Sequence, residues 1–164
     1  MKIVAISDLH GHLVSLPPAD VVCIAGDITP VRSHLNIEAQ WQWYIDCYLP
    51  WVESLPCKKV ITVAGNNDYC FLHQSPISTS KHIYLQNTGI EIEGVTFYGS
   101  PNVPKSCNRK AFSKKDEKLT ELFARIPNKL DVLICHATPY GANGCGVMAG
   151  SERDKGCIEL SEAI

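Results

Sequence analysis

The sequence lacks any apolar run approaching the length of about 20 residues that a membrane-spanning helix needs. Its first residues, MKIVAISDLHGH, form an apolar stretch too short for the core of a signal peptide, and no small-residue cleavage site follows. We therefore expect no membrane partner, a cytoplasmic location, and a first strand of the fold at this end.

An excess of charge of either sign is also absent. The 164 residues include 15 Lys and Arg against 17 Asp and Glu, a formal net charge of −2. The basic residues of segment 109–118 are interleaved with Asp116 and Glu117, as on a solvated helix face. We therefore expect no nucleic-acid footprint, and the pattern does not indicate an oligomeric state.

Cysteine pairs of the CxxC type are missing too, although the chain has eight cysteines. Without export they are expected to stay reduced. Cys23 and Cys135 lie inside apolar runs, where cysteine behaves as a small hydrophobic residue. Cys145 and Cys157 lie near glycines late in the chain, and we favour a core position over a functional role for both.

What the sequence does contain is a series of short, nearly continuous apolar runs rich in β-branched residues. Such runs are typical of strands that are buried on both faces. They are KIVAIS at 2–7, DVVCIAG at 20–26, KKVITVAG at 58–65 and DVLICHA at 131–137. Segment 37–55 has helical spacing, with Asn36 as its N-cap and an interruption at Pro50.

The pattern changes after residue 82. Segment 82–100 alternates apolar and polar residues and carries turn signals at 87–89 and 93–94, which predicts antiparallel strands and a hairpin. Segment 112–125 predicts an amphipathic helix, and a last short helix is expected at 155–164. Strands alternating with helices around an inserted hairpin predict one α/β layered sandwich domain over residues 1–164.

Polar residues follow each of the four apolar runs. They are Asp8 and His10 after the first, Asp27 after the second, Asn66, Asn67 and Asp68 after the third, and His136 after the fourth. In open α/β sheets, functional groups gather at the carboxyl ends of strands. Any one of these residues is explained by a helix cap or a turn, but all of them together predict one shared site.

The chemistry of these side chains indicates a metal site. Carboxylate, imidazole and amide donors suit divalent ions such as manganese, iron or zinc. The set offers no thiolate, which argues against a structural zinc site. A carboxylate between two half-sites can bridge two cations about 3.5–4 Å apart, as in two-metal phosphoester hydrolysis.

The blocks SDLHG, AGDI, AGNND and CHATPYG, in this order, resemble the successive motifs of calcineurin-like metallophosphoesterases. The resemblance implies an α/β/β/α sandwich and two divalent cations, with Mn²⁺ expected and Fe, Zn, Ni or Co as alternatives. It implies that Asp8 and His10 bind the first cation and that Asp27 bridges both. Asn66 and His136 would bind the second.

Two departures from the family pattern bear on catalysis. The family often has a histidine that protonates the leaving group where this chain has Asn67, and Asp68 would orient that histidine. An amide can donate a hydrogen bond but not a proton, so Asn67 and Asp68 are the catalytic candidates in altered form. The family's closing GHxH block is also missing, because no histidine follows His136, so we expect a domain that is incomplete at its C-terminus.

The resulting prediction is metal-dependent hydrolysis of a small phosphomonoester or phosphodiester, with segment 137–150 forming part of the substrate wall. The alternative is a degenerate module that keeps the fold, binds metal weakly or not at all, and acts in binding. A flavodoxin-like nucleotide-binding module is a remote third reading, because no Gly-rich phosphate loop follows the first run.

Overall fold

The computed structural model describes residues 1–33, 35–105, 110–142 and 156–164. Four parallel strands form the first sheet in the order β1-β2-β3-β4. They are β1 (Ile3–Ile6), β2 (Ala19–Ala25), β3 (Cys57–Val63) and β4 (His82–Tyr84). The four apolar runs are confirmed as strands, three of them here and the fourth in a second sheet.

The second sheet has the order β5-β6-β9 and lies over the first. Its strands are β5 (Thr88–Ile92), β6 (Val95–Ser100) and β9 (Val132–Cys135). β5 and β6 form the predicted antiparallel hairpin, and Glu93 and Gly94 at its turn both have positive φ. A short pair, β7 (Val103–Pro104) with β8 (Ser113–Lys114), lies beyond β6.

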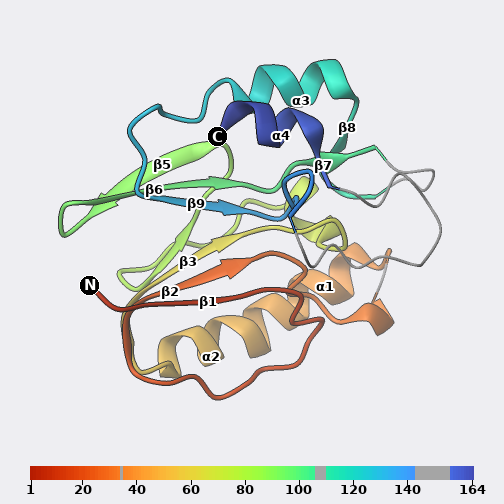
Figure 1. Ribbon diagram of the computed structural model, residues 1–164. Coiled ribbons are helices and arrows are strands. Elements are labelled where there is room, and N and C mark those ends of the chain that lie inside the picture. The colour runs from red at the N-terminus through yellow and green to blue at the C-terminus, as the bar shows by residue number, and fades with distance from the viewer. Residues whose placement is uncertain (34, 106–109, 143–155) are drawn as a thin grey trace.

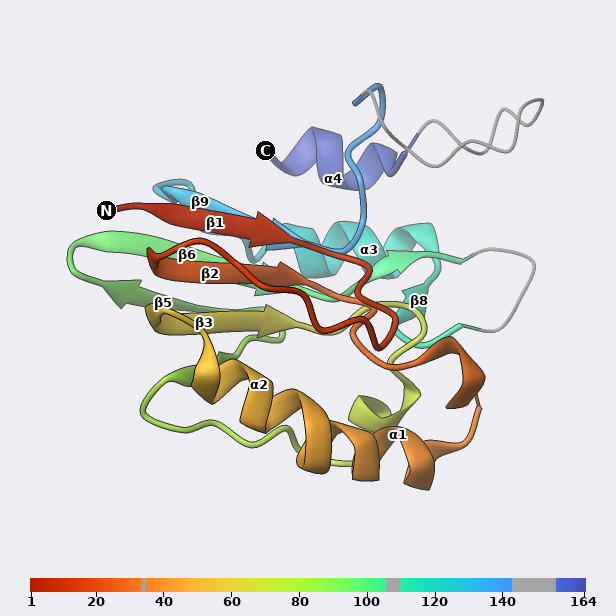
Figure 2. The ribbon, with the colours of Figure 1, turned by 90° about the horizontal axis from the view of Figure 1, so that it is seen from below.

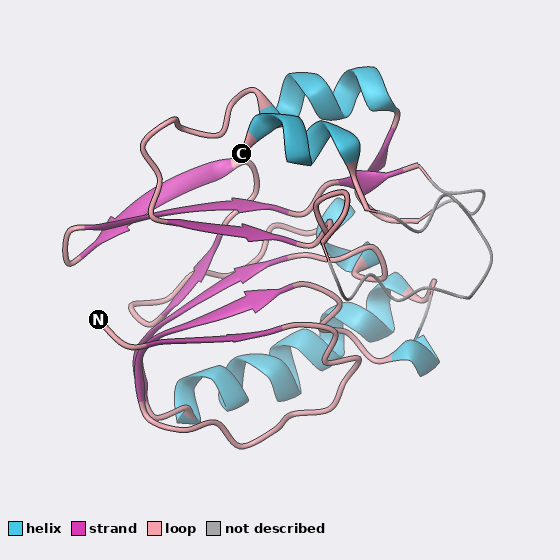
Figure 3. Cartoon of the chain, viewed as in Figure 1, coloured by secondary structure: helices cyan, strands magenta, loops and turns pink. Residues whose placement is uncertain are grey.

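Helices cover the outer faces of the two sheets, so the layers follow the order α/β/β/α (Figure 1). Below the first sheet lie α1 (Ile37–Trp43), η2 (Tyr44–Tyr48) and α2 (Leu49–Ser54). Above the second sheet lie α3 (Asp116–Phe123) and α4 (Ile158–Ala163). The short turns η1 (Val31–Ser33) and η3 (Tyr69–Leu72) belong to the loops at the strand ends (Figure 3).

Three apolar cores hold these layers together, one in each interface. Tyr44 and Tyr48 are fully buried between the first helices and the first sheet. Val63 and Phe97 belong to the core between the sheets. Phe123, Leu160 and Cys157 belong to the core under α3 and α4. The core position predicted for Cys157 is confirmed, and Cys145 lies outside the described residues.

Some local predictions were wrong. β4 pairs in parallel with β3, so the antiparallel pattern begins only after Asn87, whose φ of 54° turns the chain toward the second sheet. Phe112 lies in a turn with a φ of 54°, Ser113 and Lys114 pair with β7, and the helix begins only at Asp116. The helix predicted at 155–164 begins at Ile158, and residue 155 lies outside the described residues.

The interruption predicted at Pro50 takes the form of a π-helical turn. The N–H of Leu49 bonds to the carbonyl of Tyr44, five residues back, and Pro50 then lies in the first turn of α2. Proline has no N–H, and the first turn of a helix needs none. Asn36 is confirmed as the N-cap of α1, because its Oδ1 accepts from the N–H of Ala39 over 2.9 Å.

Candidate metal centre

The loops that follow β1, β2, β3 and β9 meet at one end of the two sheets, where the arrows of these strands point (Figures 1 and 2). The first two loops continue to pair after their strands end. The N–H of Asp8 donates to Gly26 O over 2.9 Å, and the N–H of His10 donates to Asp27 O over 2.8 Å. These bonds fix the positions of three side chains that the sequence assigned to the site.

Asp8, His10 and Asp27 all have positive φ, at 55°, 47° and 53°. A non-glycine residue in this region is strained by on the order of 1–3 kcal/mol. The hydrogen bonds between the two loops hold these conformations in place. Such strain clusters at functional sites, where it orients side chains that a relaxed turn would direct elsewhere.

Two glycines let the strand ends approach so closely. A Cβ on Gly65 would lie 2.2 Å from Oδ1 of Asp27, and a Cβ on Gly26 would lie 2.6 Å from Nδ1 of His136. Both distances are far below contact. The glycines of the AGDI and AGNND blocks are therefore required by packing at the site.

Asp8, Asp27 and His136 each offer a ligand atom, and these three atoms lie within 4.8 Å of one another. The Nε2 atom of His10 lies 3.9 Å from Oδ1 of Asp8 and 3.7 Å from Oδ2 of Asp27. These separations are too long for hydrogen bonds and suit groups that surround a shared cation. Asp27 is buried, with 2% of its surface exposed, whereas Asp8 is open to solvent.

The imidazole of His136 is oriented by the protein for metal binding. Its Nδ1 lies 2.7 Å from the carbonyl oxygen of Ala25, which can only accept, so Nδ1 carries the proton. Nε2 is then the free acceptor, 3.4 Å from Oδ1 of Asp27. A histidine ligand whose other nitrogen donates to a backbone carbonyl is the usual arrangement at metal sites. The donor set therefore fits a divalent cation.

A family model for calcineurin-like phosphoesterases matches residues 1–159 of the sequence. The chain belongs to this family. Calcineurin-like phosphoesterases are typically metal-dependent hydrolases, and the cluster of Asp and His side chains agrees with that chemistry. No helix in the described parts of the chain is long and apolar enough to cross a membrane.

Matches to curated relatives cover nearly all of the chain. The UPF0046 protein K07C11.7 of Caenorhabditis elegans is 29% identical over 100% of this chain and 59% of its own length. The metallophosphoesterase domain-containing protein 1 of Homo sapiens is 25% identical over 99% of this chain and 56% of its own length. The chain thus spans little more than half of these relatives.

One further relative is named for a different activity. The probable rhamnogalacturonate lyase C of Emericella nidulans is 26% identical over 90% of this chain, but the match covers only 15% of that protein.

The two catalytic candidates of this calcineurin-like domain face different surroundings. Asn67 turns toward the cluster, where its backbone N–H donates to Oδ1 of Asp27 over 2.7 Å and its Nδ2 donates to Oδ2. Asn67 thus donates to both oxygens of the buried carboxylate of Asp27. The carbonyl of Asn67 accepts in turn from Nε2 of Gln40 over 2.8 Å, and this buried residue of α1 was not identified from the sequence.

Asp68 turns into the protein interior and is fully buried. Its carboxylate accepts from the N–H groups of Gly65 (2.8 Å), Ile28 (3.2 Å) and Thr29 (2.9 Å), and from the Thr29 hydroxyl (2.8 Å). Burial raises the pKa of Asp68, and the negative charge of Asp27 raises it further. These contacts support a role in positioning the loops after β2 and β3.

Asn66 has a partner that the sequence analysis missed. Its Oδ1 accepts a hydrogen bond from Nζ of Lys110 over 3.0 Å. Segment 109–118 was interpreted as a solvated helix face, and that interpretation is wrong for Lys110, which is half-buried against the loop after β3. No local signal marks this contact, because Asn66 and Lys110 are 44 positions apart.

Proposed function

We propose that this chain hydrolyses phosphoesters through two divalent cations held by Asp8, His10, Asp27, Asn66 and His136. The main support for this proposal is one observation. The two carboxylate oxygens of Asp27 face different imidazoles, Oδ2 toward His10 at 3.7 Å and Oδ1 toward His136 at 3.4 Å. A carboxylate placed in this way suits a bridge between two cations.

When bound, the cations would lower the pKa of a water molecule and neutralise charge on the phosphoryl oxygens. The chain itself supplies their ligands and the hydrogen bonds that hold Asp27 from Asn67. Asn67 has no acidic proton for the departing oxygen. We therefore expect a preference for esters with good leaving groups, such as aryl esters.

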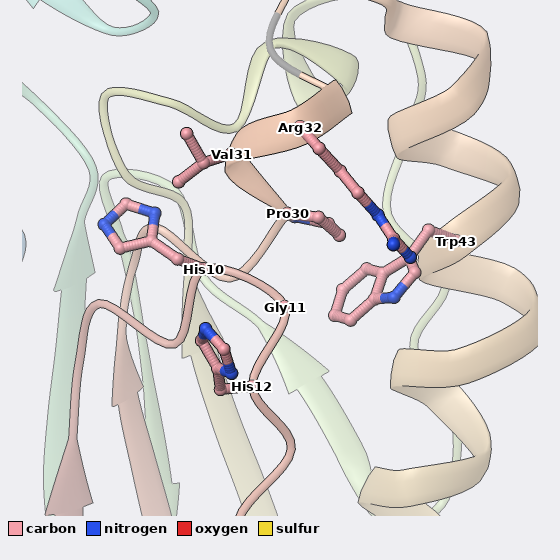
Figure 4. A pocket seen from close by; sticks show the side chains of 7 residues that line it. All are labelled: His10, Gly11, His12, Pro30, Val31, Arg32 and Trp43. Atoms are coloured by element: carbon pink, nitrogen blue, oxygen red, sulfur yellow. The ribbon is translucent and has the colours of Figure 1, made fainter.

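A cavity of about 360 Å³ beside His10 offers a place for the substituent of the ester. His12 and Arg32 bring polar nitrogen atoms to its wall, and the indole of Trp43 forms an apolar wall (Figure 4). Arg32 forms no ion pair with any residue that the structure describes. A small phosphoester fits these features, with Arg32 near its negative charge and Trp43 against an aromatic group.

The experiment is an assay with p-nitrophenyl phosphate and bis(p-nitrophenyl) phosphate, with and without Mn²⁺, using the 164-residue chain. Hydrolysis should rise with Mn²⁺ and stop with chelator, and Asp27→Asn should abolish it. The absence of hydrolysis at saturating Mn²⁺, with the fold intact by circular dichroism, would instead support the degenerate binding module.

A further inference from the structure

The ammonium group of Lys110 contacts a side-chain atom of Asn66, the residue that the proposed function assigns as a ligand of the second cation. An ammonium group has hydrogens to donate and no lone pair to accept, so the Asn66 atom it contacts at 3.0 Å must be the amide oxygen. This oxygen is the one that would bind the second cation. The contact therefore directs two cations, the ammonium of the chain and the metal ion from solution, to the same oxygen atom of Asn66.

The contact is built into the fold beyond the side chain of Lys110. The N–H of the next residue, Ala111, donates to the carbonyl of Asn66 over 3.0 Å, and Ala111 is fully buried. The Ser113 hydroxyl donates to the carbonyl of Lys110 over 2.7 Å. The pairing of β8 with β7 then fixes the chain that follows. The backbone at Lys110 is thus held next to Asn66, so the contact does not depend only on the conformation of a flexible side chain.

Among the residues that the structure describes, the other half of the centre has no such competitor. Lys110 forms no ion pair with Asp8 or Asp27 within the described residues, whereas His10 lies within 4 Å of both carboxylates. A first cation at Asp8, His10 and Asp27 therefore meets no lysine of this kind among the described residues. A second cation at Asn66 would lie only a few ångströms from the ammonium, where repulsion is strong because the side chains are partly buried.

We propose that Lys110 competes with the second cation for Oδ1 of Asn66, so that the two positions fill in separate steps of unequal affinity. This inference rests on the proposed two-cation site and adds a residue that sets how readily the site is completed. The second cation binds only when Lys110 leaves Asn66, and Lys110 then remains beside the site as a positive charge for a phosphate oxygen.

Calorimetric titration with Mn²⁺, combined with electron paramagnetic resonance to detect a coupled Mn²⁺ pair, tests this. In the wild-type chain we expect a second step at least tenfold weaker than the first. Lys110→Met should strengthen the second step about tenfold or more and leave the first step unchanged. Lys110→Arg, which keeps the charge, should retain the weak second step.

Lys105→Met is the matched control, because it removes the same charge from an exposed position next to β7. It should behave as wild type. Lys110→Gln serves as a second neutral variant if the methionine variant does not fold. Equal second-step affinities in the wild type and in both neutral variants would overturn the role of Lys110 and leave the proposed function standing. No Mn²⁺ binding in any of these chains would overturn both.

Discussion

The carboxylate of Asp68 accepts two hydrogen bonds from Thr29, one from the backbone N–H over 2.9 Å and one from the hydroxyl over 2.8 Å. Both residues are buried, and Thr29 follows Asp27 by two positions. The pair therefore ties the loop after β3 to the loop that carries the central carboxylate of the candidate metal centre.

Thr29→Val should lower the free energy of unfolding by about 1.5–3 kcal/mol, because it removes a hydrogen bond to a buried charged group. Urea denaturation measures this loss. Thr29→Ser is the control, since it keeps the hydroxyl and loses only a methyl group. The absence of a loss in Thr29→Val, which keeps the shape of threonine, would show that the hydroxyl bond to Asp68 does not contribute to stability.

The two carboxylates of the centre should differ in their importance for metal binding. Asp27 lies within 4 Å of both imidazoles, whereas Asp8 is exposed and, among the described residues, comes that close only to the imidazole of His10. Asp27→Asn should weaken Mn²⁺ binding by about a hundredfold or more, beyond the range typical of residues that only support ligands. Asp8→Asn should affect mainly one of the two binding steps. Calorimetric titration of both variants decides this, and equal, mild effects would contradict a bridging role for Asp27.

His82 should make the stability of the fold depend on pH. It is fully buried, with Nδ1 2.7 Å from Ile77 O and Nε2 3.0 Å from Oγ1 of Thr62. Burial lowers the pKa of His82 below its ordinary value of 6.5. Below pH 6.5 the unfolded chain therefore binds a proton that the native chain does not, and stability falls as the pH falls toward the lowered native pKa.

The expected slope from this one group is at most about 1.4 kcal/mol per pH unit. Urea denaturation between about pH 5 and pH 7.5 should show this slope in the wild type and a flatter dependence in His82→Gln. His73→Gln, at an exposed position, should keep the wild-type slope. A wild-type slope in His82→Gln would exclude His82 as the source.

Much of the site could be predicted from the sequence because its parts are local patterns joined by a simple rule. Each apolar run is followed by its own polar residues, and parallel strands place these residues at one edge. The rule holds even for His136, although β9 lies in the second sheet. The parallel pairing of β4 was not predictable, because alternation indicates one exposed face and carries no information on strand direction.

The different roles of neighbouring residues could not be predicted from local sequence patterns either. Asn67 and Asp68 are adjacent, yet one faces Asp27 and the other the interior, which depends on how the loop after β3 packs against Thr29. Lys110 lies in a stretch of basic residues, and no feature of that stretch marks its contact with Asn66. Long-range contacts of this kind depend on the assembled fold.

Asn67→His should change how the rate depends on the leaving group. The backbone bond from residue 67 to Asp27 does not involve the side chain and should persist. An imidazole with a pKa near 6.5 can donate a proton at neutral pH, which an amide cannot, and general acid catalysis is worth about a hundredfold or more. At saturating Mn²⁺, hydrolysis of an alkyl phosphate should therefore rise by about this factor, whereas hydrolysis of p-nitrophenyl phosphate, whose leaving group needs no proton, should change little.

Asn67→Gln is the matched control, because it alters the side chain without adding an acid. If the histidine and glutamine variants give the same ratio of alkyl to aryl rates, then the group at position 67 does not reach the departing oxygen, and its role is confined to holding Asp27.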